Sequence, residues 1–344
     1  MVNIAVFSFL LFSSVNASRS IDTVVRNRYH QGSAAMREKV KVVDVTARDG
    51  LQNEPKPVST RDKLALIEKL VQAGVTDIQA TSFVHPKWVP QMADAEEVAA
   101  GLGKFSGVTF SALVPNLKGY ERALAAGIRQ MEFVIAASET FNRKNLNRSM
   151  AESLQLLEQA TRMAERDGVV LRVGFSTCFH CPFEGKISSQ AVLNAARAAR
   201  QIAPWRIAIC DTDGMAFPNQ VTETVGLLLS ELKLKADDLI LHFHDTYGRG
   251  LANTLAGLEA GVREFDSCTA GLGGCPYCPG ASGNLATEDL VDFLEGIGYD
   301  TGIDMEKLLD AAEFACRFSS RPYQGHLLRA RRAGACGVAP VAPA

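Results

Sequence analysis

From Val40 onward, short apolar runs rich in β-branched residues alternate with longer amphipathic stretches. The short runs are typical of buried strands, and the longer stretches are typical of helices with one apolar face. Eight strands are predicted: Val40–Thr46, Asp77–Ser82, Thr109–Val114, Gln130–Ala136, Leu171–Thr177, Arg206–Thr212, Leu239–Asp245 and Glu264–Ala270. The helices predicted between them are Thr60–Ala73, Asn116–Ala126, Ser149–Arg166, Ser188–Ile202, Asn219–Leu232 and Gly248–Ala260.

This alternation predicts the α/β class and a single (β/α)8 TIM barrel. An open doubly wound sheet is the alternative, because strands and helices alternate there too. Two further helices, Leu285–Gly296 and Asp304–Phe318, are expected after the eighth strand. We therefore expect one barrel domain over residues 40–320 with additional C-terminal helices.

The two ends of the chain lie outside this pattern. Residues 1–39 form an N-terminal extension whose apolar run, Ile4–Val15, resembles a signal-peptide core but is preceded by no Lys or Arg. The run is too short to span a membrane, and Met36 is an alternative start. Residues 321–344 are expected to be a flexible tail, because the chain from Arg329 is basic and then rich in Ala, Gly, Pro and Val.

Composition narrows the classes of partner and the cellular compartment. A formal net charge of -2 gives no bulk attraction for nucleic acid or an anionic membrane, so an acidic ligand must be held by local groups. The eight cysteines favour a reducing compartment, the cytoplasm or the mitochondrial matrix of a eukaryote. A four-thiolate zinc site from Cys178, Cys181, Cys275 and Cys278 is an alternative, although the two pairs lie far apart and differ from zinc ribbons.

Two histidines in the seventh predicted strand are the most informative residues. Side chains alternate along a strand, so His242 and His244 point to the same side, while Leu241 and Phe243 point into an apolar layer. Two neutral imidazoles at the C-terminal end of a strand make half of a divalent metal site. A packed or hydrogen-bonded histidine pair is the alternative.

Closure of a barrel brings further candidate ligands to these histidines. Barrel active sites lie at the C-terminal ends of the strands, and strands seven, eight and one are consecutive around the ring. Asp49 follows the first strand, and Asn284 ends a Gly-rich loop after the eighth. One carboxylate, two imidazoles and an amide oxygen suit Mg²⁺ or Mn²⁺ and leave positions for water or substrate.

Other polar residues near the strand ends are candidates for substrate binding, namely Arg48, Gln79 and Asp211, with Asn145 in the loop after the fourth strand. An ion pair between Arg48 and Asp49 is not expected, because consecutive strand residues point to opposite faces. Cys275 lies in the Gly-rich loop, where a thiol can act as acid, base or nucleophile; an incidental cysteine is the alternative. Motifs of nicotinamide, nucleotide-hydrolysing and serine-hydrolase enzymes are absent from the sequence.

Longer motifs carry a resemblance to a known family. They are Arg48-Asp-Gly-Leu-Gln-Asn-Glu54, Thr81-Ser-Phe-Val84, Pro86-Lys-Trp-Val-Pro-Gln-Met92, Pro115-Asn-Leu-Lys-Gly119, Pro182-Phe-Glu-Gly-Lys-Ile187, His242-Phe-His-Asp-Thr-Tyr-Gly248, Ala270-Gly-Leu-Gly-Gly-Cys-Pro-Tyr277 and Gly280-Ala-Ser-Gly-Asn-Leu-Ala-Thr-Glu-Asp289. These segments resemble the hydroxymethylglutaryl-CoA lyase family, a group of metal-dependent barrel enzymes. The resemblance covers roughly Lys41 to Phe318.

The resemblance implies cleavage of a 3-hydroxy-3-methylglutaryl-CoA-like thioester to acetyl-CoA and acetoacetate. By resemblance, Asp49, His242, His244 and Asn284 hold the metal, and Arg48 is a catalytic cation that stabilises the enolate oxygen. Asp49 or a metal-linked histidine would take the hydroxyl proton. Cys275 or His242 would then protonate the enolate.

One departure from the family leaves the substrate open. The family has a glutamate where this chain has Gln79, which can still hydrogen-bond Arg48 but removes a negative charge. The alternatives are a lyase for another 3-hydroxyacyl-CoA, such as citramalyl-CoA or a longer-branched glutaryl-CoA, a related condensing enzyme, or a metal- or CoA-binding homologue without turnover. Gln79 and the loop Cys178-Phe-His-Cys181 are the differences that bear on the choice among these substrates. A homodimer or higher homo-oligomer is expected.

Overall fold

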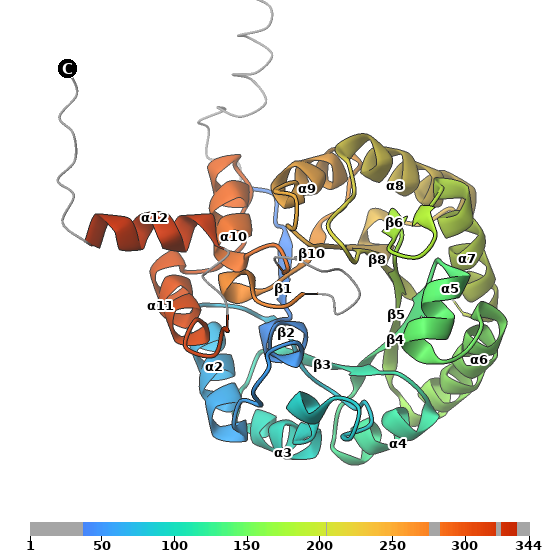
Figure 1. Ribbon diagram of the computed structural model, residues 1–344, viewed down its shortest axis with the longest axis horizontal. Coiled ribbons are helices and arrows are strands. Elements are labelled where there is room, and N and C mark those ends of the chain that lie inside the picture. Colours follow the sequence, from blue (N-terminus) through green and yellow to red (C-terminus); the bar gives the residue numbers. More distant parts are fainter. Residues whose placement is uncertain (1–36, 204, 275–282, 321–324, 336–344) are drawn as a thin grey trace, which may run out of the picture.

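The computed structural model describes residues 37–203, 205–274, 283–320 and 325–335. Within this part of the chain, eight parallel strands close a barrel in the order β1-β10-β9-β8-β5-β4-β3-β2 (Figure 1). The predicted TIM barrel is therefore confirmed, and the open doubly wound sheet is excluded.

The barrel strands follow the predicted runs closely. Their bounds are β1 Lys41–Asp44, β2 Asp77–Ser82, β3 Thr109–Val114, β4 Gln130–Ala136, β5 Val170–Ser176, β8 Arg206–Asp211, β9 Leu239–Phe243 and β10 Glu264–Ser267. A short antiparallel hairpin, β6 (His180–Cys181) with β7 (Gly185–Lys186), is inserted after β5. Strands β1, β9 and β10 end two or three residues before their predicted ends. At each of these ends the chain leaves the sheet to build the mouth of the barrel.

The helices surround the barrel (Figure 1). They are α2 Thr60–Gln72, α3 Ala95–Ala100, α4 Leu117–Ala125, α5 Glu139–Phe141, α6 Met150–Asp167, α7 Ser189–Ile202, α8 Pro218–Leu232, α9 Gly250–Glu259, α10 Thr287–Gly296, α11 Met305–Ala315 and α12 His326–Ala335. Several begin at a side-chain cap, such as the Ser149 capping box with Glu152 at α6. In the described parts of the chain, none of the helices is long and apolar enough to cross a membrane.

The outward faces of the strands form the core with the helices. Leu241 and Phe243 are buried there, as their alternation with the histidines predicts. Leu241 packs so closely on α9 that a Cβ added at Gly257 would overlap its side chain. The opposite, inward faces are thereby left to line the interior of the barrel.

The ends of the chain differ from the expectation in two places. Residues 326–335 form helix α12 instead of a flexible tail, because Leu328 is buried and the helix packs on α10 and α11. At the other end, Arg37 pairs with Glu295 and Glu38 with Arg263, so residues 37–39 already belong to the packed domain. The signal-like run and Met36 lie outside the described residues.

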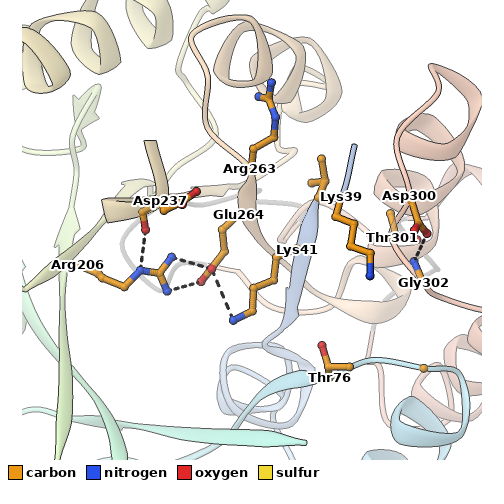
Figure 2. Close-up of a pocket in the computed structure, with 12 residues that line it drawn as sticks. Lys39, Lys41, Thr76, Arg206, Asp237, Arg263, Glu264, Asp300, Thr301 and Gly302 are labelled. Atoms are coloured by element: carbon orange, nitrogen blue, oxygen red, sulfur yellow. Dashed lines mark hydrogen bonds and ion pairs between the residues drawn. The ribbon is translucent and has the colours of Figure 1, made fainter. Parts of the chain in front are cut away.

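The N-terminal end of the barrel contains a cavity of about 470 Å³ (Figure 2). Opposite charges pair around it: Arg206 donates to Glu264 at 2.7 and 3.1 Å, and Lys41 lies 2.6 Å from Asp77. Lys41 also lies 3.7 Å from Glu264. This end of the barrel is therefore a network of ion pairs.

Candidate active site

The first site segment is a buried π-helical turn, η1 (Thr46–Gly50), directly after β1. The backbone N–H groups of Arg48, Asp49 and Gly50 all donate to the carbonyl oxygen of Val45. In such a turn, successive side chains do not point to opposite faces. Arg48 consequently donates to the carboxylate of Asp49, and the expectation that these residues form no ion pair is wrong.

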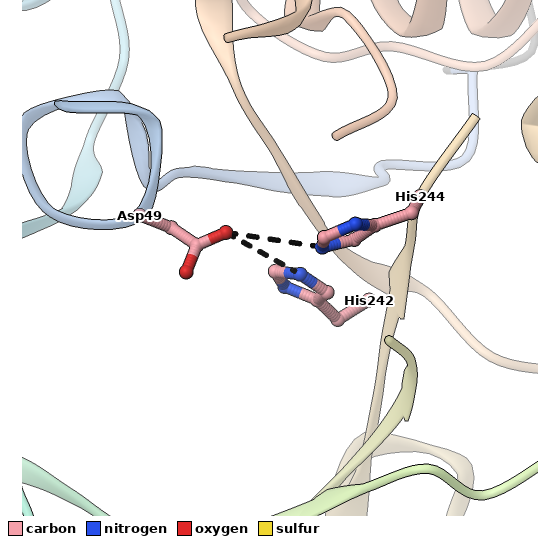
Figure 3. A group of neighbouring side chains, drawn as sticks. All are labelled: Asp49, His242 and His244. Atoms are coloured by element: carbon pink, nitrogen blue, oxygen red, sulfur yellow. Dashed lines mark ion pairs between the residues drawn. The ribbon is translucent and has the colours of Figure 1, made fainter. Parts of the chain in front are cut away.

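The two histidines meet Asp49 at the mouth of the barrel (Figure 3). His242 lies on β9, and His244 lies just beyond it, bridged to Asn284. Their Nε2 atoms are 4.0 and 3.9 Å from Asp49 Oδ2. In the described residues, Asp49, His242 and His244 are the one group of His, Cys, Asp and Glu side chains gathered as a metal site, with ligand atoms within 4.8 Å of one another.

Asn284 completes this group. Its Nδ2 donates to Asp49 Oδ2 at 2.8 Å and to the Leu272 carbonyl oxygen at 3.0 Å, whereas its buried Oδ1 has no hydrogen-bond partner. His244 Nδ1 is likewise buried without a partner. Because an unpartnered buried polar atom is costly, a cation that accepts the lone pair of Asn284 Oδ1 fits this side of the site. The residues present therefore fit a divalent ion.

The protonation states suit such an ion. Burial raises the pKa of Asp49, but Arg48 and the two imidazoles more than offset this, so the pKa lies below its ordinary value. Burial lowers the pKa of both histidines; at His242 the hydrogen bond that Nδ1 donates to Asp266 reverses the effect, and the pKa is raised. Burial and neighbouring His242 lower the pKa of His244 to about 4. Asp49 is thus ionised and His244 neutral near neutral pH, as metal ligation requires.

Gln79 lies on β2 with its side chain completely buried. Its Oε1 accepts a hydrogen bond from Arg48 Nε, as expected for this residue. Its Nε2 donates to Glu132 Oε2 on β4 at 2.6 Å. The structure therefore brings Arg48, Asp49 and Gln79 together beside the histidines.

Asp211 ends β8 and is also buried. Its Oδ1 accepts from the Ala216 backbone N–H at 3.1 Å, and its Oδ2 has no hydrogen-bond partner. Burial, followed by the negative charge of Asp213, raises the pKa of Asp211 to about 8. Its carboxyl group can therefore exchange a proton near neutral pH.

The pairing of His180 with Asp213 was not predicted from the sequence. His180 Nδ1 lies 2.5 Å from Asp213 Oδ2, where the β6–β7 hairpin approaches the turn after β8. The only signal in the sequence is a histidine in the loop Cys178-Phe-His-Cys181. Its partner follows a different strand, so only the folded barrel joins them.

Comparison with known proteins places this geometry in a family. A family model described as HMGL-like matches residues 39–315. The chain belongs to the HMGL-like family. It is 47% identical over 284 residues to the mitochondrial hydroxymethylglutaryl-CoA lyase of Macaca fascicularis, with 83% of this chain and 87% of that protein covered. It is 44% identical over 277 residues to hydroxymethylglutaryl-CoA lyase YngG of Bacillus subtilis, with 80% of this chain and 92% of that protein covered.

Solved structures of HMGL-like relatives have the same fold. The crystal structure of the Bacillus subtilis HMG-CoA lyase matches with a TM-score of 0.82 at 41% identity, covering 87% of this chain and 100% of that chain. An HMG-CoA lyase from Acinetobacter baumannii, in complex with coenzyme A and 3-methylmalate, matches with a TM-score of 0.82 at 37% identity, covering 91% and 100%. The resemblance found in the sequence is confirmed.

The remaining predicted residues of this HMGL-like chain are less decisive. Cys275 and Cys278 lie outside the described residues, so the thiol role stays a prediction. Cys178 donates to the Phe175 carbonyl oxygen at 3.0 Å, and Cys181 lies 3.1 Å from Ser138 Oγ. Both are free buried thiols in the core. A further candidate, Asn145, is exposed on the turn η4 (Asn142–Leu146), and its substrate contact stays a prediction.

Proposed function

We propose that this protein is a divalent-metal-dependent carbon–carbon lyase that cleaves 3-hydroxy-3-methylglutaryl-CoA to acetyl-CoA and acetoacetate. The observation that carries the proposal is the convergence of Asp49, His242 and His244 on one point beside the cation of Arg48. The names of the relatives, and the coenzyme A bound to one of them, support the thioester substrate.

In this proposal, Asp49, His242, His244 and the Oδ1 of Asn284 hold the ion. The carboxylate and amide oxygens of this ligand set suit Mg²⁺ or Mn²⁺, and the set contains no thiolate. Such an ion, when bound, lowers the pKa of a substrate hydroxyl and offsets negative charge. A buried location strengthens these electrostatic effects.

The side chains beside the ion supply the remaining requirements of the cleavage. The hydroxyl loses its proton, its oxygen becomes the new ketone, and the electron pair of the broken carbon–carbon bond forms the acetyl-CoA enolate. The guanidinium of Arg48 stabilises the enolate oxygen, and the enolate carbon then takes up a proton. Asp211 is suited to take the hydroxyl proton and to return it to the enolate carbon, because its pKa is raised to about 8 and its Oδ2 is unpartnered.

A second candidate is the same cleavage on a related 3-hydroxyacyl-CoA, such as citramalyl-CoA. The observation that favours it is the His180–Asp213 pair, which holds a hydrogen-bonding imidazole against Asp213, two residues after Asp211. A hydrogen-bonding group at this position can pair with the acyl carboxylate, which stands a methylene nearer the hydroxyl-bearing carbon in citramalyl-CoA than in 3-hydroxy-3-methylglutaryl-CoA.

The experiment is an incubation of the purified protein with Mg²⁺ or Mn²⁺ and a panel of 3-hydroxyacyl-CoAs, followed by measurement of acetyl-CoA release. We expect the highest kcat/KM with 3-hydroxy-3-methylglutaryl-CoA and loss of cleavage after chelation. Preference for another thioester selects the second candidate. Binding of the ion without release of acetyl-CoA from any substrate would leave a non-catalytic homologue.

Compartment and assembly complete the proposal. Cys178, Cys181, Cys210, Cys268 and Cys316 are free thiols, which suits the reducing bacterial cytoplasm or mitochondrial matrix. Mitochondrial and bacterial proteins are among the relatives. A homodimer or higher homo-oligomer stays a prediction, which light scattering on the purified protein tests.

A further inference from the structure

Polar side chains inside the barrel form a closed ring of contacts beside the metal-binding group. Its members, in order of contact, are Arg48, Gln79, Glu132, Arg172, Asp266, His242 and Asp49. The ring contains two guanidinium groups and three carboxylates. Only part of it belongs to the site described above, and Glu132 and Arg172 are members without an assigned role.

Glu132 lies on β4, where it is 4% exposed and stands directly opposite Arg172 of β5. A single oxygen, Oε2, accepts hydrogen bonds from both Arg172 Nε and Gln79 Nε2, each at 2.6 Å. Glu132 therefore serves two cations: Arg172 directly, and Arg48 through the amide of Gln79.

The neighbouring strand is shaped around this carboxylate. Gly174 lies two residues after Arg172 on β5, on the same inward face. A Cβ added at Gly174 would overlap the Glu132 carboxylate, and its nearest neighbours are all atoms of that side chain. The absence of a side chain at this position thus leaves room for Glu132 to reach Gln79.

The chemistry of the amide explains what the carboxylate does. A carboxamide presents an acceptor oxygen on one side and a donor NH₂ on the other, and a flip exchanges them. An ionised carboxylate only accepts, so Glu132 fixes the NH₂ of Gln79 on its own side. The oxygen of Gln79 must then face Arg48, whose guanidinium only donates.

We propose that Glu132 is a positioning residue of the lyase: its carboxylate fixes the amide of Gln79, which in turn holds the guanidinium of Arg48 at the reacting centre. The inference rests on the proposed function. It assigns the effect to orientation of Arg48, without contact between Glu132 and substrate or ion.

The first test compares Glu132→Gln with wild type in the acetyl-CoA release assay. We expect kcat to fall by about 10- to 100-fold, as is typical when a supporting hydrogen bond is lost, with KM changed by less than about threefold. The matched control is Glu264→Gln, which removes a buried barrel carboxylate that pairs with Arg206 at the opposite end. An unchanged kcat in Glu132→Gln overturns the inference.

Two further variants separate orientation from fold damage. Gly174→Ala keeps every charge but pushes the Glu132 carboxylate aside, and we expect it to lower kcat to a similar extent. The double variant Gln79→Glu with Glu132→Gln moves the carboxylate next to Arg48 and should restore kcat to within about threefold of wild type. Failure of this rescue, with a folded protein by thermal unfolding, contradicts the proposed path.

A third test of the inference uses nuclear magnetic resonance and metal binding, neither of which depends on turnover. The Nε–H signal of Arg48, assigned by its disappearance in Arg48→Lys, should shift or exchange faster in Glu132→Gln and stay unchanged in Glu264→Gln. Mn²⁺ affinity should change by less than about threefold, whereas a loss of 10-fold or more would mean action through Asp266 and His242 instead. A wild-type protein inactive on every thioester contradicts the proposed function, while an unmoved Arg48 signal contradicts this inference.

Discussion

The two ends of the barrel both gather charged side chains, but they do so differently. At the N-terminal end, Lys41, Arg206 and Glu264 line a cavity of about 470 Å³ (Figure 2). Lys41 also pairs with Asp77, so each of these charges faces an opposite one. None of the described residues that line this cavity has a buried side-chain polar atom without a partner. The arrangement is complete without a ligand.

At the C-terminal end, the charged groups are more deeply buried, and several polar side-chain atoms there have no hydrogen-bond partner. Asn284 Oδ1, His244 Nδ1 and Asp211 Oδ2 are all buried without a partner. Each such atom costs about 1 to 3 kcal/mol, so the fold maintains this end at the expense of stability. Unsatisfied polar atoms, and not cavity volume, therefore distinguish the end built for chemistry from the end built for stability.

The largest effect is expected from removal of a metal ligand at the C-terminal end. We expect Asp49→Ala and His242→Ala to reduce divalent-cation-dependent cleavage by about 10³-fold or more, roughly 4 kcal/mol of activation free energy. Acetyl-CoA release with and without chelator measures the effect. Turnover that survives either substitution would remove the metal site from the mechanism.

A smaller effect is expected one contact away, at Asp266. Its Oδ2 lies 3.2 Å from His242 Nδ1 and fixes the direction in which Nε2 points. Asp266→Asn should weaken Mn²⁺ binding by about 10- to 100-fold, as is usual for a residue that supports a histidine ligand. Calorimetric titration with Mn²⁺ measures this. Unaltered affinity would show that the ring of contacts does not orient His242.

Metal affinity should also depend on pH at this end. Burial lowers the pKa of His242, but Asp266 reverses the effect and leaves it raised, so below this pKa the ion must displace a proton. Affinity is therefore expected to fall by about tenfold for each unit of pH below the pKa of His242. His244, with its pKa lowered to about 4, adds a second proton only in stronger acid. A constant affinity from about pH 5 to pH 7 would contradict this assignment of protonation states.

The sequence predicts the barrel well where local pattern determines structure. The bounds of β2, β3 and β4 agree with the predicted runs, because a turn at a glycine, Gly74, Gly107 and Gly127 respectively, comes shortly before each strand. The expected strand Glu264–Ala270 extends too far, since Ala270 adopts a left-handed backbone conformation, with φ of 63°, that the local composition does not reveal. Tertiary contacts at the mouth determine that boundary.

The residues of the site also differ in whether a local pattern predicts them or only tertiary contacts bring them together. The spacing of His242 and His244 is a local signal, and their common direction follows from strand geometry. The contact of Arg48 with Asp49 was not predictable, because nothing in Thr46–Gly50 distinguishes a π-helical turn from a strand end. Glu132 is a lone acidic residue in an apolar strand, and its role appears only when barrel closure brings Gln79 to it.

The smallest predicted effect tests the end built for stability. Glu264→Gln should leave kcat and metal affinity unchanged, because its contacts with Arg206 and Lys41 lie at the opposite end of the barrel from Arg48. We expect a loss of only about 1 kcal/mol in the free energy of unfolding. The Arg206 side chain is 35% exposed, so water replaces part of the lost interaction, and Lys41 keeps its ion pair with Asp77.

Denaturant unfolding at low and high salt measures this difference in the free energy of unfolding, which should shrink as salt screens the ion pairs. A drop in kcat of tenfold or more in a stably folded Glu264→Gln protein would mean that both ends take part in the reaction. Buried polar atoms without a hydrogen-bond partner would then no longer distinguish one end of the barrel from the other.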